Sequence, residues 1–93
     1  MSKQAYHHTL ERRLAQLDGQ IEEARQRLEA GSPRDHVAAA GELRLLEDKR
    51  RELQDRLERL DQEPEGAWED FKTSMEDLLD EITVSVENWF KTH

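Results

Sequence analysis

The side chains best suited to chemistry in this chain are its four histidines and its many carboxylates. His7 and His8 are adjacent, whereas His36 and His93 lie far from them in the sequence. Adjacent residues point about 100° apart on a helix, so one helix does not present both to a single metal ion in the usual i, i+4 arrangement. We therefore expect no metal site, with His7 at the frayed start of a helix and the other three histidines facing solvent.

Paired carboxylates such as Glu22–Glu23 and Asp80–Glu81 are groups that general acid–base catalysis uses. Such catalysis needs a concave, partly dry site that separates two pKa values, and solvated helix faces do not provide one. The chain also contains no cysteine, no Gly-rich phosphate loop and no calcium loop of the usual spacing. The sequence thus predicts no catalytic residue, no enzyme and no cofactor.

The composition is typical of long helices. Of 93 residues, 39% are charged, 34% are hydrophobic and 5% are aromatic. The net charge of −8 disfavours nucleic acid and anionic membrane surfaces as partners, because both repel an acidic protein. The sequence shows neither a signal-peptide core nor an apolar run long enough to span a membrane. We expect a single all-α domain, residues 1–93, in the cytoplasm.

Apolar residues recur at alternating spacings of three and four in the first two-thirds of the chain, which is the pattern of helices that pack in pairs. The pattern is Leu10, Leu14, Leu17, Ile21, Ala24 and Leu28 in residues 4–30, and Ala39, Leu43, Leu46, Arg50, Leu53, Leu57 and Leu60 in residues 33–62. Between these segments, Gly31 suits a left-handed helix end, Ser32 suits a helix cap and Pro33 suits a first turn. The sequence therefore predicts an antiparallel, coiled-coil-like helical hairpin.

A third amphipathic helix is predicted over residues 66–90, which hold four of the five aromatic residues. Pro64 and Gly66 interrupt the second helix, and helical spacing of apolar residues resumes at Trp68 in a segment rich in acids. The predicted core or partner interface of this helix consists of Ala38, Leu45, Trp68, Phe71, Met75, Leu78, Ile82, Val86, Trp89 and Phe90.

Charge predicts the side of the hairpin on which the third helix docks. The acidic edge of the hairpin carries Glu11, Asp18, Glu47 and Asp61, broken by Arg25, and the basic edge carries Arg13, Arg27, Lys49 and Arg56, broken by Glu42. Because the third helix is acidic, we expect it on the basic edge, over Ala38 and Leu45. There Trp89 and Phe90 would lie over the small residues of segment 36–41, and burial of the rings would contribute more than any exposed ion pair.

Two points stay open from the sequence. The third helix can dock on its own hairpin as a three-helix bundle, or two chains can exchange it in a dimer, and the small core favours a homodimer. Arg50, the one polar residue in the apolar pattern, can pair with Glu11 or with a carboxylate of a partner chain. It can also extend its charged end into solvent past its aliphatic stem, which is the interpretation that we favour.

The stretch Gly66–Lys72, GAWEDFK, resembles part of a known group of proteins. In that group of small bacterial coiled-coil proteins, some labelled as stress-response proteins, a charged helical hairpin precedes a G-A-W-x-D-x-K tail helix. The resemblance implies a cytoplasmic, non-enzymatic bacterial helical protein linked to stress, and it implies no catalytic residues.

The sequence favours a non-enzymatic interaction or scaffold protein that associates with itself or with another helical protein. The alternative is a peripheral membrane-binding or chaperone-like module that uses the aromatic side of the third helix. A membrane partner is disfavoured because the polar side of that helix is acidic, whereas membrane-surface helices are normally basic.

Overall fold

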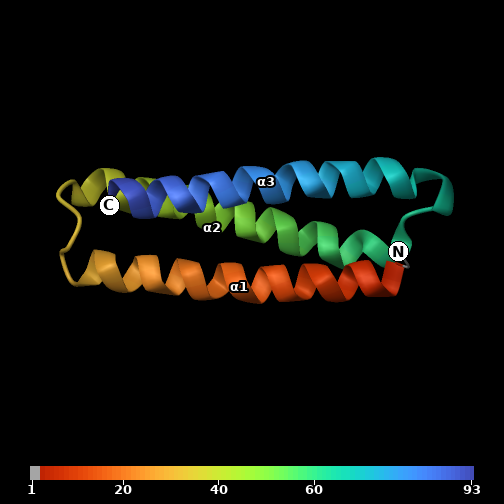
Figure 1. Cartoon of the computed structure of the whole chain (residues 1–93), viewed down its shortest axis with the longest axis horizontal. Coiled ribbons are helices and arrows are strands. Elements are labelled where there is room, and N and C mark those ends of the chain that lie inside the picture. Colours follow the sequence, from red (N-terminus) through yellow and green to blue (C-terminus); the bar gives the residue numbers. More distant parts are fainter. Residues whose placement is uncertain (1–2) are drawn as a thin grey trace.

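The computed structural model of the chain describes residues 3–93 and shows three α-helices, which confirms the all-α prediction. Helix α1 spans Lys3–Glu29, α2 spans His36–Arg59 and α3 spans Trp68–Thr92. The helices run up, down and up along a rod of 48 × 18 × 17 Å, and α3 packs on the hairpin of its own chain (Figure 1). The structure is therefore a three-helix bundle within one chain.

The end of α1 forms as the sequence predicts. Gly31 has a φ of 73°, a left-handed conformation that glycine adopts without steric cost. The amide of Gly31 donates to the carbonyl of Leu28 at 3.1 Å, and the amide of Ser32 donates to the carbonyl of Arg27 at 3.2 Å. These two bonds satisfy carbonyls that the last helical turn would otherwise leave without partners, and they turn the chain towards α2.

Helix α2 begins three residues later than predicted, at His36 rather than Pro33. Its cap is Asp35, whose side chain accepts a hydrogen bond from the amide of Ala38 at 3.0 Å, so the expected cap, Ser32, is wrong. Pro33 is buried in the turn instead. A carboxylate is a favourable cap because it also interacts with the positive end of the helix dipole.

The connection between α2 and α3 consists of two short 3₁₀ turns, Leu60–Gln62 and Glu65–Ala67. The first turn continues the path of α2 to the predicted end of that helix. The side chain of Lys3 donates to the carbonyl of Glu63 at 2.6 Å and ties this connection to the start of α1. Helix α3 runs two residues past its predicted end, to Thr92.

One continuous hydrophobic core runs along the rod and buries a side of every helix. The predicted apolar rows of α1 and α2 lie in this core, except that Leu28 is only half-buried and Arg50 is charged. Helix α2 packs closely against both other helices, whereas α1 and α3 approach each other less closely. No helix within residues 3–93 combines the length and the apolar composition needed to cross a membrane.

Candidate functional site

Helix α3 docks on the basic edge of the hairpin, as the charge pattern predicts. Lys49 forms an ion pair with Glu81. The guanidinium of Arg56 donates to the carbonyl and to the hydroxyl of Ser74, at 3.1 and 2.7 Å. These contacts lie at the surface, where each contributes little to stability, so they select the side of docking and the buried side chains supply most of the free energy.

At the end of the bundle near the α1–α2 turn, the contact between α2 and α3 depends on Trp89. The indole is 1% exposed, and its Nε1 donates to the carbonyl of Ala39 at 2.9 Å. Phe90 packs edge-on against Trp89, with ring centroids 5.2 Å apart, and the Arg27 guanidinium lies 4.8 Å from the Phe90 ring centroid. A small residue at position 39 lets the ring approach the backbone of α2, as the prediction for segment 36–41 requires.

At the opposite end, three aromatic rings join α1 to α3. Tyr6 meets Trp68 edge-on at 5.3 Å, and Trp68 stacks on Phe71 at 6.2 Å. Tyr6 is 5% exposed, and its hydroxyl has no hydrogen-bond partner among residues 3–93. Burial raises the pKa of Tyr6, and the nearby charge of Glu76 raises it further. The sequence pattern did not predict that Tyr6 is buried, because Tyr6 lies outside the apolar row of α1. Tyr6 lies seven residues before Arg13, however, and so belongs to the basic edge that α3 covers.

The predicted interface residues divide by burial. Met75, Leu78, Ile82, Val86 and Trp89 are buried, and Ala38, Trp68, Phe71 and Phe90 are half-buried.

Leu45 is 60% exposed, so the expectation that α3 covers it is wrong. It lines the rim of a shallow groove of about 270 Å³, together with Ser85 and Asn88 of α3. Leu45 therefore lies beside α3 and not beneath it, because the buried side of α3, with Met75, Leu78, Ile82, Val86 and Trp89, faces the core of the hairpin.

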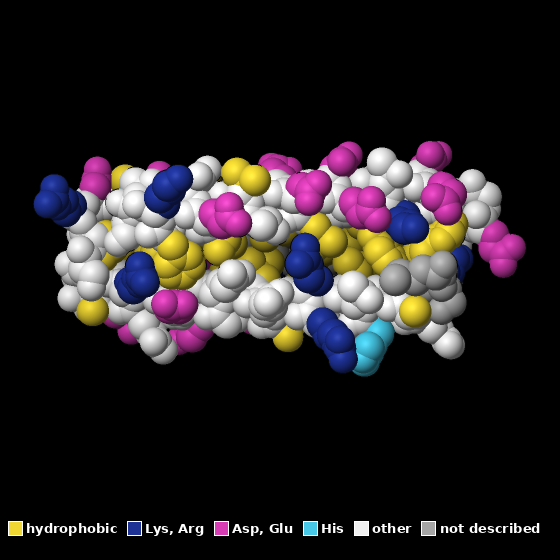
Figure 2. Space-filling model, viewed as in Figure 1, with side chains coloured by type: hydrophobic (Ala, Val, Ile, Leu, Met, Phe, Trp, Pro, Cys, Tyr) yellow, Lys and Arg dark blue, Asp and Glu magenta, His cyan; other side chains and the backbone are white. Residues whose placement is uncertain are grey.

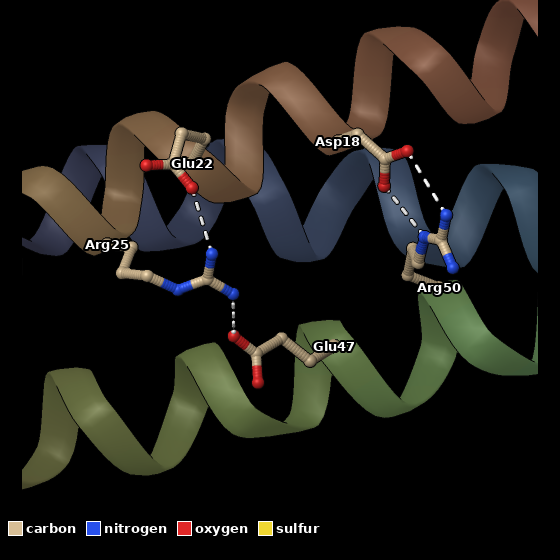
Figure 3. Close-up of polar contacts among 5 residues, drawn as sticks. All are labelled: Asp18, Glu22, Arg25, Glu47 and Arg50. Carbon is tan, nitrogen blue, oxygen red and sulfur yellow. Dashed lines mark hydrogen bonds and ion pairs between the residues drawn. The ribbon is translucent and has the colours of Figure 1, made fainter.

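The acidic edge, on the other side of the hairpin, is closed by ion pairs (Figure 3). Arg50 donates to both carboxylate oxygens of Asp18, at 2.7 and 3.1 Å. The expectation that Arg50 extends into solvent without a partner is wrong, as is the expectation of Glu11 as its partner. Arg25 bridges Glu22 and Glu47, at 2.9 and 2.7 Å.

These guanidinium groups lie over apolar side chains of the hairpin. Leu14, Ile21, Leu43 and Leu57 line shallow grooves along the acidic edge, beside Asp18, Arg25, Arg50 and their neighbours. The hydrogen bonds to Asp18 raise the pKa of the Arg50 guanidinium, so its charge is retained at this edge. The edge is therefore polar and internally paired.

The face between α1 and α3 is different. The helices approach through Tyr6–Trp68 at one end and Arg27–Phe90 at the other, and a groove of about 220 Å³ lies between. Figure 2 shows a hydrophobic band along this face, crossed by Lys and Arg side chains, with acids gathered over α3. The residues that line this α1–α3 groove are Arg13, Gln16, Leu17, Gln20, Leu53, Leu79, Ile82, Thr83, Val86 and Glu87.

The histidines do not assemble. His93 was expected in solvent, but its side chain is 4% exposed, packs on Trp89 with ring centroids 5.3 Å apart, and lies 2.6 Å from a carboxylate oxygen of Glu42. Within residues 3–93, no three His, Asp or Glu side chains are grouped so that they could hold a metal ion.

Comparison with known proteins finds no protein-family model, no curated protein and no solved structure that matches the chain. The family expected from Gly66–Lys72 stays a prediction. Function is therefore inferred from the surfaces of the three-helix rod.

Proposed function

We propose that this protein is a cytoplasmic, non-enzymatic helical interaction protein that self-associates. The observation that supports this function is the α1–α3 groove, where the three helices of one chain leave part of an apolar band uncovered. Leu79 and Phe90 on this face are only half-buried. Covering apolar surface is favourable by about 25 cal/mol per Å², so such a band is a site where another helical surface gains free energy by docking.

The remaining surface supports a role in association rather than in catalysis. On the acidic edge, Arg25 is bonded to Glu47 and Arg50 to Asp18, and the grooves beside these pairs are shallow. A link to stress responses belongs to this proposal through the resemblance of Gly66–Lys72 alone. Binding to a membrane through the aromatic side of α3 would require Trp89 to leave the core, in which it is 1% exposed.

Self-association is tested by the mass of the protein in solution. Multi-angle light scattering across roughly 1 μM to 1 mM, the range of weak to moderate protein affinities, is expected to show a rise towards twice the chain mass of 11.0 kDa. A mass that stays at 11.0 kDa over this whole range would refute the proposal.

A further inference from the structure

Helices α1 and α3 run in the same direction and keep a nearly constant register across the α1–α3 groove. The contact Tyr6–Trp68 joins residues 62 positions apart, and Arg27–Phe90 joins residues 63 positions apart. Arg13 of α1 therefore lies level with residues 75 and 76 of α3. Glu76 lies seven residues, or about two helical turns, before Thr83, which lines the groove, so Glu76 is on the side of α3 that faces α1. Arg13 thus lines the groove on the α1 side, and Glu76 lies at the same level on the α3 side, one turn before Leu79, the first α3 residue of the lining.

Both of these charged side chains are free to bind a partner. Arg13 and Glu76 are exposed, and neither forms an ion pair or a hydrogen bond with a residue in the described part of the chain. On the other faces, Arg50 binds Asp18 and Lys49 binds Glu81. The α1–α3 groove therefore has an apolar floor, with the free base Arg13 on its α1 side and the free acid Glu76 beside its α3 side.

A second copy of the same chain fits this arrangement when the two rods lie parallel. A twofold axis along the rods places α1 of each copy opposite α3 of the other, so that Arg13 of each meets Glu76 of the other at the same level. An axis across the rods would instead bring together the two α3 helices, each with seven acids against two bases. We infer that two copies dock through the α1–α3 groove as parallel rods, an inference that rests on the proposed self-association.

The face between α2 and α3 is the rival surface. Leu45 is exposed there, at 60%, beside Ser85 and Asn88 of α3. Its central ion pair, Lys49–Glu81, is already satisfied within the chain and provides no free charges for a second copy. Charge complementarity therefore favours the α1–α3 groove.

Exchanging the charges of Arg13 and Glu76 tests the inference. The experiment uses about 0.15 M salt, because charges more than about 8 Å apart are then screened and only close contacts affect dimerisation. Arg13→Glu or Glu76→Arg alone places like charges at both contacts of the twofold dimer. Each is expected to raise the dimer dissociation constant roughly 10- to 100-fold. Mixing the two variants in equal amounts is expected to restore the dimer, because both contacts of the mixed pair then join opposite charges. Light scattering measures the mass, and circular dichroism verifies that each variant keeps the helical content of the wild type.

Matched controls separate a local contact from an effect of net charge. Arg12→Glu and Asp77→Arg make the same changes of charge on the same helices, at exposed residues that point about 100° away from Arg13 and Glu76. Both are expected to dimerise within about threefold of the wild-type dissociation constant, because exposed charges away from a contact contribute little.

The outcomes are distinct. A wild-type dimer that Arg13→Glu and Glu76→Arg leave unchanged would overturn the inference and leave self-association intact. The same holds if the mixture of the two variants stays monomeric, or if Leu45→Glu is the change that dissociates the dimer. A wild-type chain that is monomeric at every concentration would overturn both the inference and the proposed function.

Discussion

Trp89 contributes to stability in two ways that one substitution can test. Its ring is among the largest fully buried side chains, and its Nε1 is bonded to the Ala39 carbonyl. Trp89→Phe removes that bond and leaves a cavity, so we expect the free energy of unfolding to fall by about 2 kcal/mol. Urea denaturation followed by circular dichroism measures the change.

Val84→Ala is the matched control on the same helix. Because Val84 is 54% exposed, its truncation is expected to change the free energy of unfolding by less than about 0.5 kcal/mol. Equal losses for Trp89→Phe and Val84→Ala would show that the indole does not hold α3 on the hairpin.

Tyr6 is expected to make stability depend on pH in the alkaline range. Burial and the charge of Glu76 raise its pKa, so the folded state holds the phenol proton more tightly than the unfolded state does. The stability that this difference contributes is fully present below about pH 10, the ordinary pKa of tyrosine, and is lost as pH rises through the higher pKa of the folded protein. Tyr6 is the only tyrosine, so its ultraviolet absorbance reports the titration directly.

Tyr6→Phe is the control for this dependence. It keeps the ring against Trp68 and removes the hydroxyl, which has no partner within residues 3–93. We expect the variant to be at least as stable as the wild type at neutral pH and to lose less stability above about pH 10. An identical alkaline loss in both proteins would assign that loss to other groups.

At the residue scale, spacing predicts the leucine core and fails where the packing partner decides burial. Leu10 and Leu53 belong to regular rows, and both are buried. Tyr6 and Leu45 both lie outside those rows, yet Tyr6 is buried under Trp68 and Leu45 is exposed. The difference arises from the path of α3, which passes over one and beside the other, and this path depends on contacts remote in sequence.

At the scale of the elements, the Arg50–Asp18 pair joins α1 to α2 on the acidic edge, and Arg50 is the one polar residue in the apolar row of α2. We expect Arg50→Leu to raise the free energy of unfolding by about 1 kcal/mol, because leucine continues the apolar row and a partly exposed ion pair contributes only about 0–1 kcal/mol. Thermal and urea denaturation measure the change.

Arg51→Leu is the control for added hydrophobicity at the adjacent, largely exposed position, and it is expected to have little effect on stability. A clear loss of stability in Arg50→Leu would show instead that the pair fixes the register of the hairpin.

The helices themselves follow from the sequence, whereas their ends follow only in part. Gly31 predicts the end of α1 correctly because its left-handed conformation has few alternatives. Ser32 and Asp35 are both good caps, and the path of the turn through buried Pro33 chooses Asp35. Arg50 finds Asp18 only once α1 and α2 are set in register.

At the scale of the whole molecule, the hairpin is expected to depend on α3. Without α3, the sides of Leu10, Leu53 and Leu60 that face the bundle core would meet water. We expect a chain of residues 1–62 to lose more than about half of the helical signal of the full protein, since short helices with a small core are marginal in water.

A separate peptide of residues 64–93 is expected to restore the helical signal when it is added to residues 1–62. The same peptide with Trp89→Glu is expected to restore much less, because the substitution places a charge in the core. A fully helical, cooperatively melting hairpin without any peptide would contradict this dependence.

The all-α fold class could be predicted from the sequence, because the apolar residues of the hairpin and of residues 66–90 follow the spacing of helices and not the alternation of β-strands. Docking within one chain was not predictable, since exchange between chains buries the same side chains. The α1–α3 groove was also missed. Charge placed α3 on the basic edge, but the distance between α1 and α3 depends on the three-dimensional packing of α2 against both.

An odd number of helices places Lys3 and His93 near opposite poles of the rod (Figure 1). A mechanical load applied at these two poles pulls along the helix axes and shears the α1–α2 and α2–α3 contacts at once. A helical bundle whose ends adjoin would instead unzip one turn at a time. Because failure under tension follows the unfolding rate and not the equilibrium free energy, this small protein should resist stretching better than its modest core suggests.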